Sequence, residues 1–281
     1  MGCLAIRVGA RGPDSRAMIV TRRESAFDCA TDVAAVREFA ARHGEPHLGP
    51  ICVVIAAYRE GQTLGLVLDA VPTKAHGLTV SLLVVDDGSD DDTMKVAEAH
   101  GAYACRTDTN RGQGAALRLG YRLAAQHGAS YVVSIDADGQ YDPKEIPALL
   151  APIIEDRADF VSGSRRLGTT YQGDTFRHLG VIVYAGLLSL LTRQKITDPS
   201  FGLRAMRIEV VTSVVLHQAQ FQASELLIGA AMRGFRLAEV PATMHPRAAG
   251  RSRKGNDLLY GAHFGWVACS TWWRERDRRA Q

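Results

Sequence analysis

Two aspartates separated by one residue, Asp136 and Asp138, stand at the end of the apolar run 131–135. Such a run, rich in β-branched residues, is typical of a buried strand in a parallel sheet. Open α/β sheets bind ligands at the carboxyl ends of these strands. Carboxylate oxygens there suit a divalent cation that carries phosphate oxygens and keeps some of its waters. The spacing therefore predicts a metal–diphosphate site built around Ala137.

A second acidic segment follows the apolar run 80–85, because residues 86–92 hold five aspartates. The segment lacks the central glycine and the terminal glutamate of an EF-hand loop. Asp86 and Asp87 stand at the predicted strand end, where a carboxylate can bind a cation or accept hydrogen bonds from a nucleobase or ribose. A structural alternative stays open, in which Ser89 or Asp90 caps the next helix and Gly88 makes the turn.

The glycine-rich segment 110–116 precedes a predicted helix. Leu117 stands where a dinucleotide-binding fingerprint has its third glycine, so the segment is very weak evidence for NAD. A glycine-rich turn before a helix N-terminus can lie close to phosphate or to the metal loop. A tight turn required only by packing is the alternative.

Basic residues are unevenly placed. Arg165 and Arg204 lie in turn-rich segments, where an isolated arginine is usually solvated. Four basic residues follow the strand-like run 237–240 within one short loop: Arg247, Arg251, Arg253 and Lys254. Such a loop is either solvated surface or a clamp for phosphates, which guanidinium groups bind bidentately.

Strands and helices alternate from residue 51 onward. The expected strands cover residues 51–55, 80–85, 102–105, 131–135 and 159–162, and the expected helices 63–70, 92–100, 115–127 and 143–154. This alternation predicts an α/β fold with a mostly parallel, doubly wound sheet and helices on both faces.

Three regions are expected along the chain. Residues 1–48 form an arm rich in glycine and arginine followed by a peripheral amphipathic helix at 32–42, residues 49–256 form the catalytic domain, and residues 257–281 form an amphipathic tail rich in aromatic and basic residues.

The composition narrows the classes of protein. The chain has 281 residues, 46% of them hydrophobic, and a net charge of +3, which is too small alone to indicate a nucleic-acid partner. Its five scattered cysteines argue against a disulfide framework or a zinc site, so a reducing, cytoplasmic setting is expected. No secretory signal is visible, and no apolar run reaches the ~18 residues of a membrane span.

The order of these motifs resembles that of family 2 glycosyltransferases of GT-A fold, and most closely the dolichol- or polyprenol-phosphate mannosyltransferase group. The resemblance covers roughly residues 51–256. It is carried by seven segments in order: residues 56–60, 85–89, 110–116, 136–143, 163–165, 198–204 and 239–253. It implies transfer of a hexose from a nucleoside diphosphate sugar, either GDP-mannose or a UDP-hexose, to a polyprenyl or dolichyl phosphate, with inversion at the anomeric carbon.

The resemblance also implies roles for single residues. Base and ribose would be held by Ala57, Tyr58, Glu60 and Asp87, and Mg²⁺ or Mn²⁺ by Asp136, Asp138 and Gln140. Phosphate groups of the donor or acceptor would be contacted by Arg204, Arg247 and Arg253, and Arg165 would belong to the donor-binding residues. The sequence departs from the family pattern at Ala56 and Arg59 in the first motif, at Phe201 beside the expected acceptor site, and at Arg253, where lysine is usual.

Alternatives remain open at this point. A related transferase acting on a soluble hydroxyl would need a base, for which Glu225 is the candidate, although it could also cap the apolar helix 226–232. A nucleotide-binding protein without transferase activity is a third class, and an NAD-dependent oxidoreductase a distant fourth. The apolar stretch 179–191 and the aromatic tail are expected either to contact the cytoplasmic face of a membrane or to be core helices.

Overall fold

The computed structural model describes residues 29–171, 175–218, 222–247 and 257–279. Its strands are β1 (Ile51–Ala57), β2 (Lys74–Ala75), β3 (Leu78–Asp86), β4 (Tyr103–Arg106), β5 (Tyr131–Asp136), β6 (Phe160–Thr170), β7 (Arg204–Arg207) and β8 (Leu237–Met244). Its helices are α2 (Ala30–His43), α3 (Leu64–Ala70), α4 (Thr93–Ala99), α5 (Gln113–Gln126), the 3₁₀ turn η1 (Pro143–Glu145), α6 (Ile146–Ile154), α7 (Thr175–Thr192), α8 (Ile208–Ser213), α9 (Gln222–Met232) and α10 (Asp257–Arg279).

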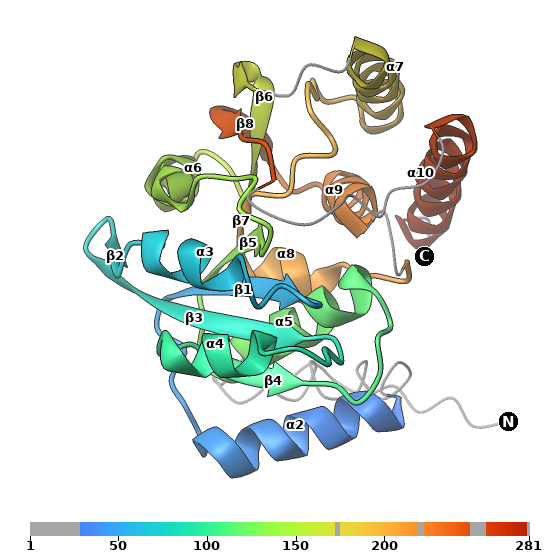
Figure 1. Cartoon of the computed structure of the whole chain (residues 1–281). Coiled ribbons are helices and arrows are strands. Elements are labelled where there is room, and N and C mark those ends of the chain that lie inside the picture. Colours follow the sequence, from blue (N-terminus) through green and yellow to red (C-terminus); the bar gives the residue numbers. More distant parts are fainter. Residues whose placement is uncertain (1–28, 172–174, 219–221, 248–256, 280–281) are drawn as a thin grey trace, which may run out of the picture.

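One mixed, mostly parallel sheet runs through the molecule (Figure 1). Strands β4, β3, β1 and β5 lie side by side and are parallel, as their apolar runs predict. The order then continues through β7, β6 and β8. Strand β7 is antiparallel to both of its neighbours, so the sheet is not parallel throughout. The predicted α/β fold with a mostly parallel sheet is confirmed, and the short strand β2 is also antiparallel to its neighbour β3.

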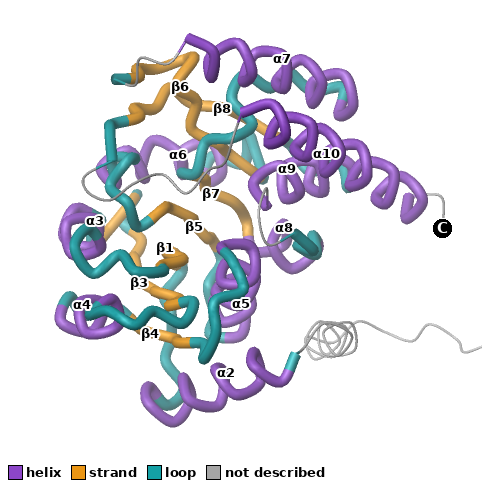
Figure 2. Tube along the Cα trace, turned by 45° about the vertical axis from the view of Figure 1, so that its right-hand side comes forward, coloured by secondary structure: helices purple, strands orange, loops and turns teal. Residues whose placement is uncertain are grey.

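Both faces of the sheet are covered by helices, because the residues of β1 alternate between two cores. Cys52 and Val54 pack with α5, whereas Ile51, Val53 and Ile55 pack on the side of α3 and α4. Figure 2 shows these helices on opposite sides of β1, β3 and β4. A parallel strand that is buried on both faces must be apolar at every position, which explains the continuous hydrophobic runs.

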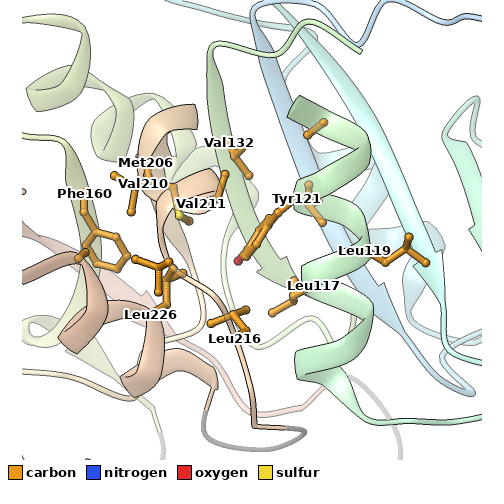
Figure 3. Close-up of a cluster of buried hydrophobic side chains, with 14 of the residues drawn as sticks. Leu117, Leu119, Tyr121, Val132, Phe160, Met206, Val210, Val211, Leu216 and Leu226 are labelled. Atoms are coloured by element: carbon orange, nitrogen blue, oxygen red, sulfur yellow. The ribbon is translucent and has the colours of Figure 1, made fainter. Parts of the chain in front are cut away.

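The first core joins the parallel half of the sheet to its second half. Figure 3 shows Tyr121 of α5 and Val132 of β5 facing Val210 and Val211 of α8, with Leu226 of α9 beyond them. These side chains are all buried. Helix α5 approaches the sheet closely, since a Cβ at Gly120 would lie 2.4 Å from Cγ1 of Val54.

In the N-terminal region the structure describes the predicted helix but not the segment before it. The predicted helix at 32–42 is α2, which ends at His43 and is followed by Gly44, a glycine with φ 68°. It covers the β4 side of the sheet, away from α7 (Figure 1). Residues 1–28 lie outside the described part of the chain.

Helix α7 contains the apolar stretch 179–191, and it lies beside α10 and α9 (Figures 1 and 2). Tyr184 and Leu188 face inward, whereas Val183 and Leu190 are exposed. Among the described residues, no helix is both long and apolar enough to cross a bilayer.

The expected cap of α4 is wrong. Asp92 precedes the helix and makes no side-chain cap, and neither Ser89 nor Asp90 replaces it. The Ser89 hydroxyl accepts a hydrogen bond from the Arg59 amide, and the Asp90 carboxylate accepts two from the Arg59 guanidinium at 2.6 Å each. These residues are therefore used to join the loop after β1 to the loop after β3.

Candidate functional site

Three neighbouring strands end together at one edge of the sheet. Ala57, Asp86 and Asp136 are the last residues of β1, β3 and β5. Ala57 is paired with Asp86, and Ala56 with Asp136, so the strand ends are level. The two acidic segments, 50 residues apart in the sequence, therefore meet at the same carboxyl edge.

Asp136 is oriented by a residue that the sequence did not single out. Nε2 of Gln113, the first residue of α5, donates to Oδ1 of Asp136 at 2.6 Å. The chain also passes close to its other oxygen, because a Cβ at Gly202 would lie 2.7 Å from Oδ2 of Asp136. Only glycine leaves this space open. Neither contact can be recognised in advance, because both partners are distant in sequence.

Asp138 is a buried carboxylate with a cation beside it. Its Oδ1 accepts a hydrogen bond from the Gln140 amide at 3.0 Å, and its Oδ2 lies 2.8 Å from Nη2 of Arg247. Burial, and then the charge of Asp136, raise the pKa of Asp138 to about 6, although Arg247 and the Gln140 amide act in the opposite direction. A carboxylate pair whose ionisation is opposed in this way gains from a nearby cation.

The donor set fits a divalent metal that brings further ligands with it. In the part of the chain that the structure describes, no three His, Cys, Asp or Glu side chains form a complete metal site. Asp136 and Asp138 supply two carboxylates, and diphosphate oxygens and water would complete the coordination of Mg²⁺ or Mn²⁺. The guanidinium of Arg247 already lies in the position of a cation beside Asp138. Ligation by the Gln140 side chain stays a prediction.

Asp87 joins the acidic loop after β3 to the glycine-rich loop before α5. Its Oδ2 accepts hydrogen bonds from the amides of Arg111 (2.9 Å) and Gly112 (2.7 Å), and Oδ1 from the Thr107 hydroxyl (3.3 Å). Burial nevertheless raises the pKa of Asp87. Gly88 has φ 76°, and a Cβ there would lie 2.9 Å from the backbone of Thr109. The glycine-rich loop thus positions Asp87, a role between the two predicted alternatives.

Residues 56–60, the first of the seven segments, lie against the loop after β3 and the loop before α5. The Ala57 carbonyl accepts the Asp87 amide at 2.9 Å. Oε2 of Glu60 accepts the Thr63 hydroxyl at 2.7 Å, while Oε1 lies 3.8 Å from Nη1 of Arg247. The Arg59 guanidinium lies 5.2 Å from the centre of the Tyr58 ring. Ala57, Tyr58, Glu60 and Asp87 therefore lie at one edge of the sheet, and their binding of a base and ribose stays a prediction.

The guanidinium of Arg165 is hydrogen-bonded within the protein. Its guanidinium forms a bidentate pair with Asp198, at 2.6 and 3.0 Å, and donates to the Ser200 hydroxyl at 2.7 Å. Asp198 is fully buried. The contacts support a role in holding the loop that leads to β7, and the predicted part of Arg165 in donor binding stays a prediction.

Arg204 is buried beside β5, the strand that ends in Asp136. It pairs with Ser134 across the β5–β7 ladder, is 3% exposed, and donates to the Pro199 carbonyl at 3.3 Å. Burial lowers the pKa of its guanidinium, which still remains charged. Its charge acts on Asp136 from inside the protein. This location differs from the predicted direct contact with ligand phosphates.

Two expectations about the acceptor side are not supported by the contacts. Phe201 is fully buried, with its ring centre 4.6 Å from that of Tyr141, and so belongs to the core. Glu225 is also fully buried: Oε2 accepts the amides of His217 and Gln218 at 2.8 and 2.9 Å, and Oε1 lies 2.6 Å from Nη2 of Arg274. These contacts join the segment before α9 to α10, and they show neither a cap on the amides of α9 nor a base that is open to a substrate. Arg253 lies outside the described residues.

Comparison with known proteins agrees with this geometry. The model of the family described as glycosyl transferase family 2 matches residues 52–214. An undecaprenyl-phosphate mannosyltransferase of Micrococcus luteus is 30% identical over 227 residues, which cover 74% of this chain and 89% of the relative. A dolichyl-phosphate hexose transferase of Haloferax volcanii is 32% identical over 198 residues, covering 70% and 84%.

A solved structure shares the fold. Glucosyl-3-phosphoglycerate synthase of Mycobacterium tuberculosis, crystallised with Mn²⁺, uridine diphosphate and phosphoglyceric acid, superposes with a TM-score of 0.60 at 24% identity, covering 86% of this chain and 82% of that one.

Proposed function

The chain belongs to glycosyl transferase family 2 and is a glycosyltransferase, and from this premise we propose that it moves a hexose from GDP-mannose or a UDP-hexose to a polyprenyl or dolichyl phosphate. The observation that carries the proposal is the meeting of Asp136, Asp138 and Arg247 at the edge that also holds Asp87. The names of the mannosyl- and hexosyltransferase relatives support the choice of acceptor.

Different residues at this edge would hold the two anionic substrates, the nucleoside diphosphate sugar and the acceptor phosphate. Asp87 would accept hydrogen bonds from the base, and Asp136 and Asp138 would hold Mg²⁺ or Mn²⁺, which neutralises charge developing on the leaving diphosphate. Arg247, at the entrance to the loop after β8, would hold phosphate oxygens. An acceptor phosphate is already ionised at pH 7, so it can attack the anomeric carbon without a general base. Attack from the face opposite the leaving group would invert that carbon.

The surface of α7 and α10 supports an acceptor that lies in a membrane. Val183 and Leu190 are 67% and 77% exposed, and Trp266 and Trp273 are 61% and 63% exposed. Each pair is seven residues apart, so each lies along one face of its helix. Exposed tryptophans suit the headgroup region of a bilayer. We include a peripheral contact between these helices and a membrane surface in the proposal.

A donor screen tests the proposal. The protein with Mn²⁺ is incubated with GDP-mannose, UDP-glucose or UDP-N-acetylglucosamine and with anionic vesicles that contain or lack polyprenyl phosphate. We expect one donor to release its nucleotide only in the presence of the lipid phosphate, with labelled sugar in the lipid phase and protein on the sedimented vesicles. Equal turnover with a soluble hydroxyl acceptor, without vesicle association, would contradict the lipid acceptor.

The Glu225→Gln variant separates the two acceptor classes. Because Glu225 is buried and paired with Arg274, we expect the change to lower the unfolding midpoint while kcat stays within about threefold of wild type, since no step uses this carboxylate. Thermal unfolding and steady-state kinetics measure both quantities. Glu38→Gln, on an exposed carboxylate paired with Arg42, is the control. A loss of kcat on the order of a hundredfold, without loss of stability, would restore Glu225 as a general base.

A further inference from the structure

Helix α2 lies outside the residues that match the family model, yet it is firmly attached to the catalytic part of the chain. Ala35 and Phe39 are 3% and 1% exposed and belong to the same core as Cys105 and Leu119. One face of the helix is thereby fixed against β4 and α5.

The same helix buries a carboxylate near its beginning. Asp32 is 3% exposed, and its Oδ1 lies 2.5 Å from Nη2 of Arg111, while Oδ2 lies 3.8 Å from Nη2 of Arg118. Nη1 of Arg111 also contacts Sγ of Cys29 at 2.7 Å. A buried carboxylate needs such partners, because an unpaired buried charge is strongly unfavourable.

Arg111 connects this ion pair to the proposed donor site. Its side chain points to α2, while its backbone amide and that of Gly112 donate to Asp87. The next residue, Gln113, donates to Asp136. Three consecutive residues therefore orient the carboxylate predicted to bind the base and the carboxylate predicted to bind the metal. Their own position depends on where the Arg111 side chain is anchored.

We propose that Asp32 is a positioning residue for the donor site: by holding Arg111, it fixes the loop 110–113 and thus the orientation of Asp87 and Asp136. The inference rests on the proposed function only in its last step, which concerns the donor. The coupling between Asp32 and the loop is a property of the protein alone.

Two measurements on Asp32→Asn test the proposal. First, hydrogen exchange in the ligand-free protein should become faster at the amides of Arg111 and Gly112. Second, the Kd of GDP or UDP with Mn²⁺ and the KM of the donor should rise about tenfold, with little change in kcat, as when a supporting partner of a metal ligand is removed. Asp32→Glu keeps the charge and should restore much of the affinity.

Phe39→Leu is the matched control, because it loosens the packing of α2 without touching Arg111. It should lower the unfolding midpoint and leave nucleotide affinity unchanged. Equal losses of affinity in both variants at equal loss of stability would overturn the proposal, as would unchanged exchange at Arg111 and Gly112 in Asp32→Asn. If wild type binds no nucleoside diphosphate, the proposed function fails, whereas the exchange data still decide whether Asp32 fixes the loop.

Discussion

Replacing Asp138 with asparagine is expected to lower kcat/KM for the donor by about a thousandfold, which corresponds to about 4 kcal/mol of transition-state stabilisation. The change removes one of the two carboxylates predicted to bind the metal and leaves Arg247 with only the more distant Glu60 carboxylate, at 3.8 Å. Nucleotide release, measured over a range of Mn²⁺ concentrations, gives the loss, and calorimetry with Mn²⁺ and nucleoside diphosphate separates binding from chemistry. Asp69→Asn, on an exposed carboxylate of α3, is the control. Undiminished metal-dependent binding in Asp138→Asn would remove the basis of the metal site.

The same variant is expected to be more stable than wild type when metal is absent. The pKa of Asp138 is about 6 in the folded protein, above its ordinary value near 4. Between these values the folded state holds a proton that the unfolded state has lost, so stability falls as the pH rises through this interval. Urea unfolding in EDTA should show Asp138→Asn gaining on the order of 2–3 kcal/mol over wild type at pH 8, with no gain near pH 4. Below pH 6 the affinity of wild type for Mn²⁺ should also fall, because the carboxyl must first lose its proton.

Replacing Arg247 with glutamine is expected to have two opposite effects. Without donor, Mn²⁺ should bind at least as tightly as in wild type, because the guanidinium that lies 2.8 Å from Asp138 is removed. With the sugar donor bound, kcat should fall about a hundredfold, because the guanidinium proposed to hold phosphate oxygens is lost.

Arg247→Lys keeps the charge but not the bidentate geometry, so its kcat should lie between those of wild type and Arg247→Gln. Arg236→Gln, which changes an arginine paired with Asp156 and Asp159, controls for a general effect of losing positive charge. Parallel losses of metal affinity and kcat in Arg247→Gln would contradict this account and would make Arg247 a structural partner of Asp138.

The carboxyl edge of the sheet can be predicted because its elements carry local signals. Strands β1, β3 and β5 are continuous apolar runs, and parallel strands bring their carboxyl ends together. The sequence alone therefore places Asp87 and Asp136 near one another. The family model and the relatives confirm the class of enzyme that these motifs predict.

What could not be predicted depends on partners far apart in the sequence. Strand β7 is four residues long and has arginine at both ends, so it lacks the apolar run of a central strand. Arg165 pairs with Asp198, which lies 33 residues further along the chain, and Glu225 pairs with Arg274, which lies 49 residues further along. A charged residue in a loop gives the same local signal whether it binds a ligand or a distant partner. For this reason the sequence predicts Arg165 and Glu225 in the site and does not predict Gln113 there.

Strand β7 can join the sheet only after both of its neighbours have been synthesised. It inserts between β5 and β6 although it follows both in the chain. Proteins emerge from the ribosome amino end first, and their early segments begin to fold before later ones exist. The nascent chain therefore presents Asp136 and Asp138 before Arg204 and Arg247 have been made. The two aspartates of the site are therefore made first and the arginines that offset their charge last. A chain that stops near residue 200 has the repulsion between Asp136 and Asp138 but lacks both Arg204 and Arg247.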